Sequence, residues 1–282
     1  MRRLIVNADD FGLTAGVNRA VAELHAAGAA TSATLMAGAQ AAGEAIEIAR
    51  STPSLGVGCH VVLTGSAPVL DPRQIPSLID PETGRFPTTL GAFLKRLLAG
   101  KIRPDEIEAE AGAQMGRLQE AGIALTHIDT HKHTHVLPAV LRPLLGAARA
   151  RGIRAVRNPF EPAWSRRATT RAPWTRRAQV IAAGMLRGRF ERIASEEGFV
   201  TTDGAVGLTA MGLVDAAALA SLLRAMPEGT WELAAHPGYN DAELDRIRTR
   251  LRESRETERR ALLAAIPAAG VELVSFAALS RS

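Results

Sequence analysis

The sequence predicts an α/β protein: a deformed or incomplete (β/α) barrel, TIM-like, with long loops near the rim of its active site. Three observations predict this fold. Short apolar runs bounded by Gly, Pro, Asn or Asp alternate with amphipathic stretches along all 282 residues, which favours parallel strands joined by helical crossovers. About seven or eight such units fit, which favours a closed or partly deformed barrel over an open sheet. Two long excursions rich in Pro and Gly or Trp interrupt the alternation.

The predicted strands are brief and often β-branched. They are Arg3–Asn7, Ala33–Ala37, Leu55–Leu63, Ala124–Asp129, Ala155–Arg157, Phe199–Thr202, Trp231–Ala235 and Val271–Ser275. The predicted helices carry apolar residues at three- and four-residue spacing. They are Thr14–Ala27, Ala41–Arg50, Pro104–Ala121, Val136–Arg151, Leu213–Ala225 and Asp241–Ala265. Thr14 and Asp241 are expected to cap their helices.

Length and composition favour a single domain over residues 1–282. Hydrophobic side chains make up 46% of the chain and charged ones 22%, which is an ordinary globular composition. One core can extend over roughly 250–300 residues. The excursions at 65–90 and 161–195 are therefore expected to be long loops or lids beside a site, not linkers between domains.

The sequence favours a cytoplasmic protein. Met1-Arg2-Arg3 is basic, but polar residues follow from Asn7 onward, so no signal-peptide core is expected. The apolar runs fall short of the roughly 20 residues of a membrane span. The single cysteine, Cys59, excludes an internal disulfide and agrees with a reducing compartment. Peripheral attachment at the inner membrane surface stays open.

The positive charge is concentrated in one part of the chain. The net charge is +5, and residues 151–192 hold eleven Arg against two Glu. Such an excess can attract nucleic acid, anionic lipid or a phosphorylated ligand. A solvated Arg-rich face is the simpler interpretation, because short charge clusters are weakly specific.

Four segments place His or Asp at the carboxyl end of a predicted strand. They are 7–12 (Asn-Ala-Asp-Asp-Phe-Gly), 58–60 (Gly-Cys-His), 127–135 (His-Ile-Asp-Thr-His-Lys-His-Thr-His) and 235–238 (Ala-His-Pro-Gly). In α/β barrels this rim carries the ligands and catalytic groups. Taken singly, His60 could be a core histidine and His236 part of a turn, but six of the seven histidines fall on this rim.

The His and Asp side chains of 127–135 all stand at odd positions. In an extended chain they would share one face, about 6.6 Å apart. One ion cannot bind all five, because ligand atoms lie within about 2.2 Å of a metal. One or two would bind, and the others would orient them or contact substrate. A polar edge strand or a His-rich surface loop is the alternative.

Adjacent Asp9 and Asp10 can share a site only if the backbone turns, which Gly12 permits. Two neighbouring carboxylates in a dry pocket separate in pKa, so that one can bind a cation and the other can accept a proton. Cys59 is assigned to packing, since His60 must face the other way in a strand.

Together these groups fit two imidazoles and one carboxylate on a divalent metal, which is a centre for metal-assisted hydrolysis. Which Asp binds, and which of His131 and His133, stays open. The same ligands describe a non-haem Fe(II) oxygenase, although such sites usually stand in antiparallel jelly rolls. A basic protein that binds nucleic acid or anionic lipid through residues 151–192 is a third class, but aromatic side chains for base stacking are scarce.

The four motifs, in order along the chain, resemble those of the YdjC-like carbohydrate deacetylases, which include the chitooligosaccharide deacetylases. Residues 131–135 (His-Lys-His-Thr-His) and 155–162 (Ala-Val-Arg-Asn-Pro-Phe-Glu-Pro) are most similar to the deacetylases associated with hopanoid biosynthesis. The resemblance implies one catalytic domain, with a deformed (β/α) barrel, that removes acetyl from an N-acetylglucosamine unit of a hopanoid glycolipid. A deacetylase of soluble chitooligosaccharides is the alternative.

Carried over by position, the resemblance implies that Asp10, His60 and His131 hold the metal. Asp9 would be the base that activates water, and His236 would protonate the departing amine. The remaining candidates would support the site or contact substrate: His127, Asp129, His133, His135, Arg157 and Thr64. The cofactor would be one divalent ion, Zn first, with Mg, Mn, Co and Ni as alternatives. The substrate would be lipid-linked, nucleic acid is not expected as a partner, and peripheral membrane association and a homodimer stay open.

Overall fold

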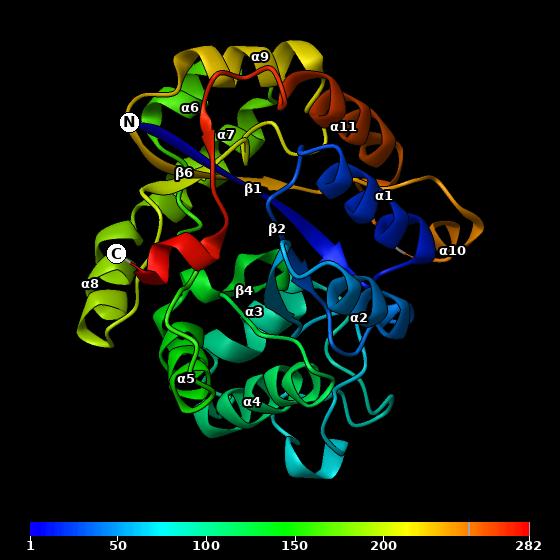
Figure 1. Ribbon diagram of the computed structural model, residues 1–282. Helices are drawn as coiled ribbons and strands as arrows, with labels where there is room; N and C mark the ends of the chain where they lie inside the picture. The colour runs from blue at the N-terminus through cyan, green and yellow to red at the C-terminus, as the bar shows by residue number, and fades with distance from the viewer. Residues whose placement is uncertain (248, 282) are drawn as a thin grey trace.

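Parallel strands form the centre of the computed structural model, which describes residues 1–247 and 249–281 (Figure 1). The strands pair in the order β4-β3-β2-β1-β6-β5, with β7 paired to β1. They are β1 (Arg2–Phe11), β2 (Ser32–Leu35), β3 (Gly56–Val61), β4 (Ile128–Thr130), β5 (Gly204–Val206), β6 (Gly229–Ala235) and β7 (Glu272–Leu273). Leu4, Ile5 and Val6 of β1 are all buried, as expected of a parallel strand covered on both faces.

The sheet curls, so that its two edges approach each other. Beyond β4, single-residue parallel bridges join Ile128 to Val156 and Ala155 to Val200. The chain then runs from Val200 into β5, which pairs with β6 at the opposite edge. The protein is therefore an α/β half-barrel with a curled parallel sheet, and the predicted TIM-like barrel is realised only in this partial form.

Helices cover the outside of the curled sheet. They are α1 (Ala15–Ala26), α2 (Ala42–Ser51), α3 (Leu90–Leu98), α4 (Pro104–Glu120), α5 (Pro138–Ala150), α6 (Ala163–Ala168), α7 (Trp174–Gly184), α8 (Arg187–Glu196), α9 (Ala216–Ala225), α10 (Ala242–Asp245) and α11 (Arg252–Ala265), with short 3-10 helices η1 (Pro72–Gln74), η2 (His131–Val136) and η3 (Phe276–Arg281). In Figure 1, β1 crosses the middle of the molecule, with α6, α7, α9 and α11 toward one side and α2 to α5 toward the other.

Both predicted helix caps are confirmed. Oγ1 of Thr14 accepts a hydrogen bond from the Val17 N–H at 3.2 Å, and Oδ1 of Asp241 accepts one from the Leu244 N–H at 2.8 Å. Each satisfies a backbone donor that the first turn of a helix leaves free. The Asp241 carboxylate also accepts from the Gly16 N–H at 2.7 Å, so it ties α10 to the start of α1.

Two large apolar clusters fill the space between sheet and helices. The larger packs the strands β1 to β4 against helices that include α1, α4 and α5, and it contains Cys59, which is fully buried as its assignment to packing predicted. Burial also raises the pKa of the Cys59 thiol well above its usual range. The smaller cluster packs β5 and β6 against α9 and α11.

The excursion at 161–195 corrects the prediction of a long loop, because it contains α6, α7 and most of α8. No residue of α7 is buried, and its large apolar side chains Trp174 and Ile181 are exposed, so this helix does not form by packing an apolar face against the core. The excursion at 65–90 does consist of turns around η1. It leads into α3, a helix that was not predicted from the sequence.

Other boundaries also differ from expectation. The single helix predicted over 241–265 is two helices, α10 and α11. β5 was not predicted, because Gly204-Ala205-Val206 is too short to show a pattern. Of the predicted strand Ala124–Asp129, only Ile128 and Asp129 belong to β4, because Thr126 and His127 approach β3 without regular pairing.

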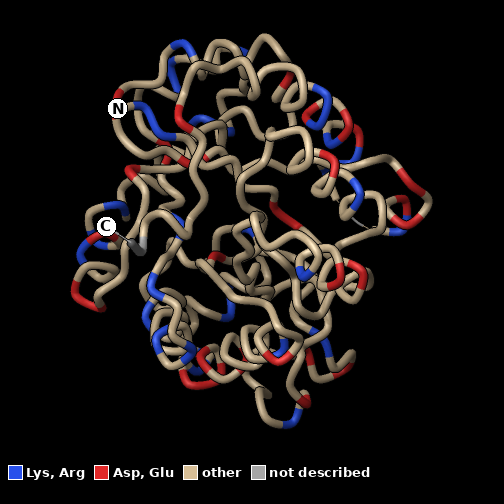
Figure 2. Tube along the Cα trace, in the orientation of Figure 1, with Lys and Arg blue, Asp and Glu red and all other residues tan. Residues whose placement is uncertain are grey.

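In the described part of the chain, every helix is too short or too polar to cross a membrane. Most Lys, Arg, Asp and Glu positions lie toward the outside of the trace, and a few lie near its centre, where the site described below forms (Figure 2).

Candidate active site

The end of β1 is distorted so that two consecutive carboxylates reach the same site. The pairing of β1 with β2 shifts register between Ala8 and Phe11, and Asp10 has a φ of 63°. A positive φ at a residue other than Gly is uncommon and costs of order 1–3 kcal/mol. The turn expected at Gly12 therefore begins two residues earlier, at Asp10 itself, although Gly12 also has a positive φ of 95°.

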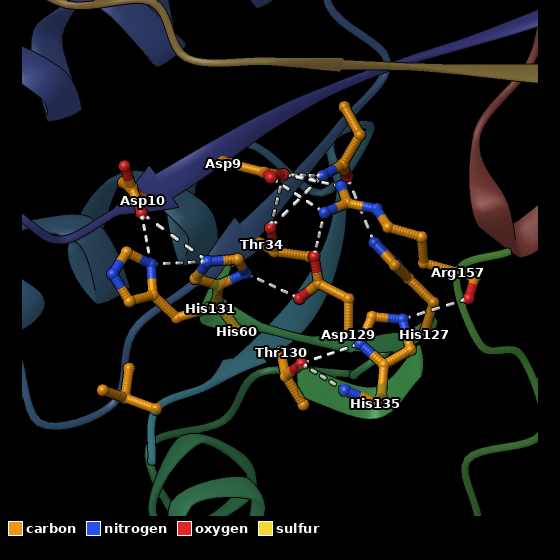
Figure 3. A network of polar contacts seen from close by, with 12 residues as sticks. Asp9, Asp10, Thr34, His60, His127, Asp129, Thr130, His131, His135 and Arg157 are labelled. Carbon is orange, nitrogen blue, oxygen red and sulfur yellow. Dashed lines mark hydrogen bonds and ion pairs between the residues drawn. The ribbon is translucent and has the colours of Figure 1, made fainter. Parts of the chain in front are cut away.

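Three side chains from three segments bring ligand atoms together (Figure 3). Oδ1 of Asp10 lies 3.5 Å from Nε2 of His60 and 3.2 Å from Nδ1 of His131. The two imidazole nitrogens are 3.3 Å apart. Tetrahedral ligands at 2.0–2.1 Å from a metal would be separated by about 3.3 Å, so this triangle has the dimensions of a divalent metal site.

The chemistry of the triangle also fits a cation. Oδ1 of Asp10 is buried and accepts no conventional hydrogen bond from the described residues, whereas Oδ2 accepts from Arg255 at 2.5 Å. Burial by itself would raise the pKa of Asp10, but the charges of Arg255 and His131 outweigh it and hold the pKa well below its usual range. The carboxylate is thus ionised and offers one free oxygen.

Asp129 orients the His60 ligand. The Nδ1–H of His60 donates to Oδ1 of Asp129 at 2.7 Å, which leaves Nε2 to face Asp10 and His131. Burial would lower the pKa of His60, but the carboxylates of Asp129, Asp9 and Asp10 raise it to about 9.

Ligand atoms of Asp9, His60 and Asp129 also lie within 4.8 Å of one another. However, the Arg157 guanidinium already pairs with both of these carboxylates. A cation at this second group would have to displace a buried positive charge, so the group with Asp10 is the better metal site.

Asp9 is held by a dense set of donors. Nη1 and Nη2 of Arg157 donate to its two oxygens at 2.8 and 2.6 Å. Asn7 Nδ2 and Thr34 Oγ1 donate to Oδ1 at 2.8 and 3.0 Å. Burial would raise the pKa of Asp9, but Arg157 overrides it and lowers the pKa far below the usual range. Nε2 of His236 stands 3.7 Å from Oδ2 of Asp9.

Arg157 lies at the centre of the charge network and not on an Arg-rich surface. It is fully buried and contacts Asp9, Asp129 and Glu232, with Nε of Arg157 2.7 Å from Oε1 of Glu232. Three carboxylates share one guanidinium. Burial, which outweighs the pull of Arg157, raises the pKa of Glu232 to about 7.

The other histidines of 127–135 do not join His131, so the prediction of one shared face was wrong. The strand ends at Thr130, and the left-handed φ values of Lys132 (59°) and His133 (52°) turn the chain into η2. His133 is not part of the group of ligand atoms formed by Asp10, His60 and His131, and its ring centroid lies 6.2 Å from that of His135. Nδ1 of His133 is buried without a hydrogen-bond partner among the described residues, and burial lowers the pKa of His133 to about 3.

His127 and His135 have structural partners. His127 donates through Nε2 to Asn7 Oδ1 at 3.1 Å and stacks on Phe276 with ring centroids 3.8 Å apart. His135 accepts from Thr130 Oγ1 at 2.7 Å and donates through Nε2 to the Arg157 carbonyl at 3.3 Å. Both support residues that touch Asp9. Thr64 is buried near the end of β3, and its Oγ1 has no partner among the described residues.

Sequence reasoning missed Glu232, Arg255 and Glu258, which are all buried. Glu232 interrupts the apolar strand β6, and Arg255 and Glu258 lie on the face of α11 that also carries Ala261 and Leu262. A charged side chain on an otherwise apolar face was the available signal, because buried charges are usually paired or functional.

Comparisons with known proteins show which family the chain resembles in sequence and fold. A family model described as "YdjC-like protein" matches residues 3–268. A carbohydrate deacetylase from Mus musculus is 37% identical over 249 residues, covering 84% of this chain and 78% of that protein. One from Thermoanaerobacter pseudethanolicus is 29% identical over 262 residues, covering 93% of this chain and 91% of that protein.

Another carbohydrate deacetylase, from Brevibacillus brevis, is 45% identical over 146 residues, and that match spans only about half of each protein (52% of this chain and 55% of the relative). Among solved structures, a proposed cellobiose-phosphate cleavage protein from Enterococcus faecalis V583 superimposes with a TM-score of 0.78 at 26% identity, over 99% of this chain and 98% of that one. The half-barrel is thus shared over the whole length of a solved structure.

Proposed function

The chain belongs to the family of YdjC-like proteins, and from this premise we propose that it is a carbohydrate deacetylase, a hydrolase that removes the N-acetyl group from an N-acetylglucosamine unit. One observation carries the proposal: the triangle of Asp10, His60 and His131 lies beside the ionised Asp9 and next to His236. A ligand triangle, a proton acceptor and a proton donor are the groups that amide hydrolysis at a metal requires.

Asp10, His60 and His131 would hold one divalent ion, for which Zn is the first candidate because a His₂-carboxylate set is common in hydrolytic zinc sites. Bound there, the ion supplies positive charge that polarises an amide carbonyl and lowers the pKa of water. Arg255 engages the other oxygen of Asp10, so it would fix Asp10 as a ligand through a single oxygen.

Asp9 takes the proton of the attacking water, and Arg157 keeps its carboxylate ionised and correctly oriented. Burial lowers the pKa of His236, so its ring is neutral before the reaction. The proton accepted by Asp9 therefore passes across the 3.7 Å to His236, which delivers it to the amine nitrogen. The water oxygen bonds to the carbonyl carbon, the C–N bond breaks, and acetate and the glucosamine unit leave.

For the substrate, we propose an N-acetylglucosamine unit carried by a hopanoid glycolipid, with soluble chitooligosaccharides as the alternative. The support is that residues 131–135 and 155–162 resemble the corresponding motifs of the deacetylases associated with hopanoid biosynthesis. In the structure these two segments lie together, because His135 donates to the carbonyl of Arg157.

The test is acetate release from N-acetylglucosaminyl glycolipid and from chitooligosaccharides, before and after metal removal by a chelator. We expect release to stop on removal and to return when one divalent ion per chain is restored. Full activity in protein shown by elemental analysis to be metal-free would overturn the metal-dependent mechanism. Acetate release from neither substrate by the metal-loaded protein would overturn the substrate class.

A further inference from the structure

Helix α7 lies on the surface, within the excursion at 161–195. The structure describes every residue of this helix, and none of them is buried. Trp174 at its start is 78% exposed, Ile181 is 56% exposed, and Met185 immediately after it is 81% exposed. At 100° per residue these three side chains fall within about 40° of one another around the helix axis. A row of large exposed apolar side chains on one helix face indicates a docking surface.

Another side of α7, about 100–140° around the helix axis from this row, is attached to the protein. Val180 packs against Ala205, Leu208 and Ala234, which belong to β5, the loop after it and β6. Ala234 stands two residues before His236, so α7 lies beside the rim that carries the candidate active site. The apolar row therefore points outward from the neighbourhood of the site.

Positive charge is concentrated in the segment that carries the apolar row. Residues 162–190 contain seven Arg and no Asp or Glu. Two of these Arg are paired, Arg171 with Asp215 at 2.8 Å and Arg187 with Glu191 at 2.7 Å. The other five have no acidic partner among the described residues: Arg166, Arg167, Arg176, Arg177 and Arg189. Of these, Arg166 and Arg177 donate to backbone carbonyls of the excursion at 161–195, so they keep their charge without an acidic partner. The segment thus combines an excess of positive charge with exposed apolar side chains.

We propose that α7, with its flanking Arg residues, is a docking surface for an anionic lipid membrane. Trp174, Ile181 and Met185 would enter the boundary between headgroups and acyl chains, and the Arg side chains would contact the anionic headgroups. This is the arrangement of an interfacial amphipathic helix, in which apolar burial and electrostatic attraction add. The docking would bring the rim near His236 to a lipid surface.

Two other occupants fit less well. A second copy of the chain, packed symmetrically on this face, would bring two clusters of unpaired Arg together. A single-stranded nucleic acid needs several exposed aromatic side chains for stacking. Trp164 of the same segment instead packs edge-on against Trp231 with ring centroids 5.1 Å apart, which leaves Trp174 alone.

The first test uses the full-length protein and vesicles of phosphatidylcholine, with or without phosphatidylglycerol. We expect co-sedimentation with the anionic vesicles only, and a loss of binding at high salt. Tryptophan emission should shift to the blue on binding, because Trp174 is strongly exposed, and Trp174→Phe should remove the shift while binding persists.

The second test compares matched variants. Replacing Arg167, Arg176 and Arg189 by Gln should weaken vesicle binding about fivefold per residue, hence about a hundredfold together. The control replaces the exposed Lys101, Arg224 and Arg250 by Gln, which changes the net charge equally. Ile181→Ser should also weaken binding about tenfold or more, whereas Leu98→Ser, at an 82% exposed position on another helix, should not.

Equal binding to both kinds of vesicle, or equal loss in the control variants, would overturn the docking proposal. So would a dimer in solution that Ile181→Ser dissociates. Acetate release from a soluble chitooligosaccharide separates this proposal from the enzymatic one. If every α7 variant loses vesicle binding but still releases acetate at the normal rate, the result supports docking. If the protein binds vesicles but releases no acetate, only the proposed activity is overturned.

Discussion

The Asp9 carboxylate owes its ionised state to Arg157, which touches Asp9, Asp129 and Glu232 together. A buried guanidinium with three carboxylates is a costly arrangement, since each charge loses its hydration. Removing one partner of such a network leaves an uncompensated buried charge, which costs more than the pair contributes. We therefore infer that the network serves to position Asp9 and keep it ionised, and not to stabilise the folded protein.

The two adjacent carboxylates are expected to respond differently to removal of their charge. Asp9→Asn should reduce acetate release by about 10²- to 10⁴-fold, the usual contribution of a proton-transfer group, and should leave the metal content unchanged. Asp10→Asn should instead lower the metal content, because Asp10 supplies one corner of the ligand triangle. Elemental analysis and acetate assays measure both. Asp105→Asn, at an exposed position of α4, is the control, and loss of metal in Asp9→Asn alone would mean that the two roles are exchanged.

Glu232 is expected to make stability depend on pH. Its pKa of about 7 in the folded protein lies above the 4.5 of an exposed Glu, so the folded state keeps a proton that the unfolded state releases. The free energy of unfolding should therefore fall as the pH rises from 4.5 to 7, by at most about 3 kcal/mol from this group, and level off above 7. Glu232→Gln should remove that part of the fall, measured by urea unfolding across this range. If the free energy of unfolding depends on pH identically in the unchanged protein and in Glu232→Gln, Glu232 is already ionised at pH 4.5.

At the scale of elements, the site depends on where regular structure stops. Asp9 and Asp10 both lie in the site because the last residues of β1 bulge. His131 lies close to Asp10 because β4 ends at Thr130, immediately before it. The left-handed backbone at Asp10, Lys132 and His133 stores strain next to the ligands. Strain of this kind persists only where surrounding packing imposes it.

Packing between β3 and His127 supplies one such constraint. A Cβ atom added at Gly58 would lie 2.5 Å from the His127 ring, which Phe276 and Asn7 hold in place. Gly58→Ala should therefore destabilise the protein by about 1–3 kcal/mol and shift His60, two residues along the same strand, enough to weaken metal binding.

Thermal or urea unfolding and a metal titration measure both effects. Gly43→Ala is the matched control, because nothing lies within 4 Å of its added Cβ and α2 should gain up to about 1 kcal/mol from the better helix former. Equal stability changes in the two variants would contradict the steric argument.

At the scale of the whole molecule, parallel strand direction brings the site together. β1, β3, β4 and β6 are parallel, so their carboxyl ends lie at the same end of the curled sheet. Residues 9, 60, 131 and 236 therefore meet there although they lie far apart in sequence. The single-residue bridges beyond β4, at Val156 and Val200, continue the sheet to the position from which Arg157 reaches Asp9.

Binding of a divalent ion at this edge should stabilise the fold as a whole. A ligand at a hundred times its Kd contributes about 2.7 kcal/mol when it binds only the folded state. For a chain of this size we expect a rise in Tm of about 5–10 °C on adding Zn²⁺ to chelated protein. Asp10→Asn should show little or no rise, and an equal rise in that variant would place the ion elsewhere.

Local sequence patterns predicted the α/β class, most of the helices and strands, both helix caps and the strand ends at which His and Asp gather. These features follow from local periodicity, capping chemistry and the rule that parallel strands end together. The folded structure was needed to show that His131 and not His133 meets Asp10, that Arg157 is buried, and that Glu232 and Arg255 contact residues of the site. Each of these depends on the backbone conformation of one or two residues, or on contacts between segments far apart in sequence, and a local pattern does not specify the partner in such a contact.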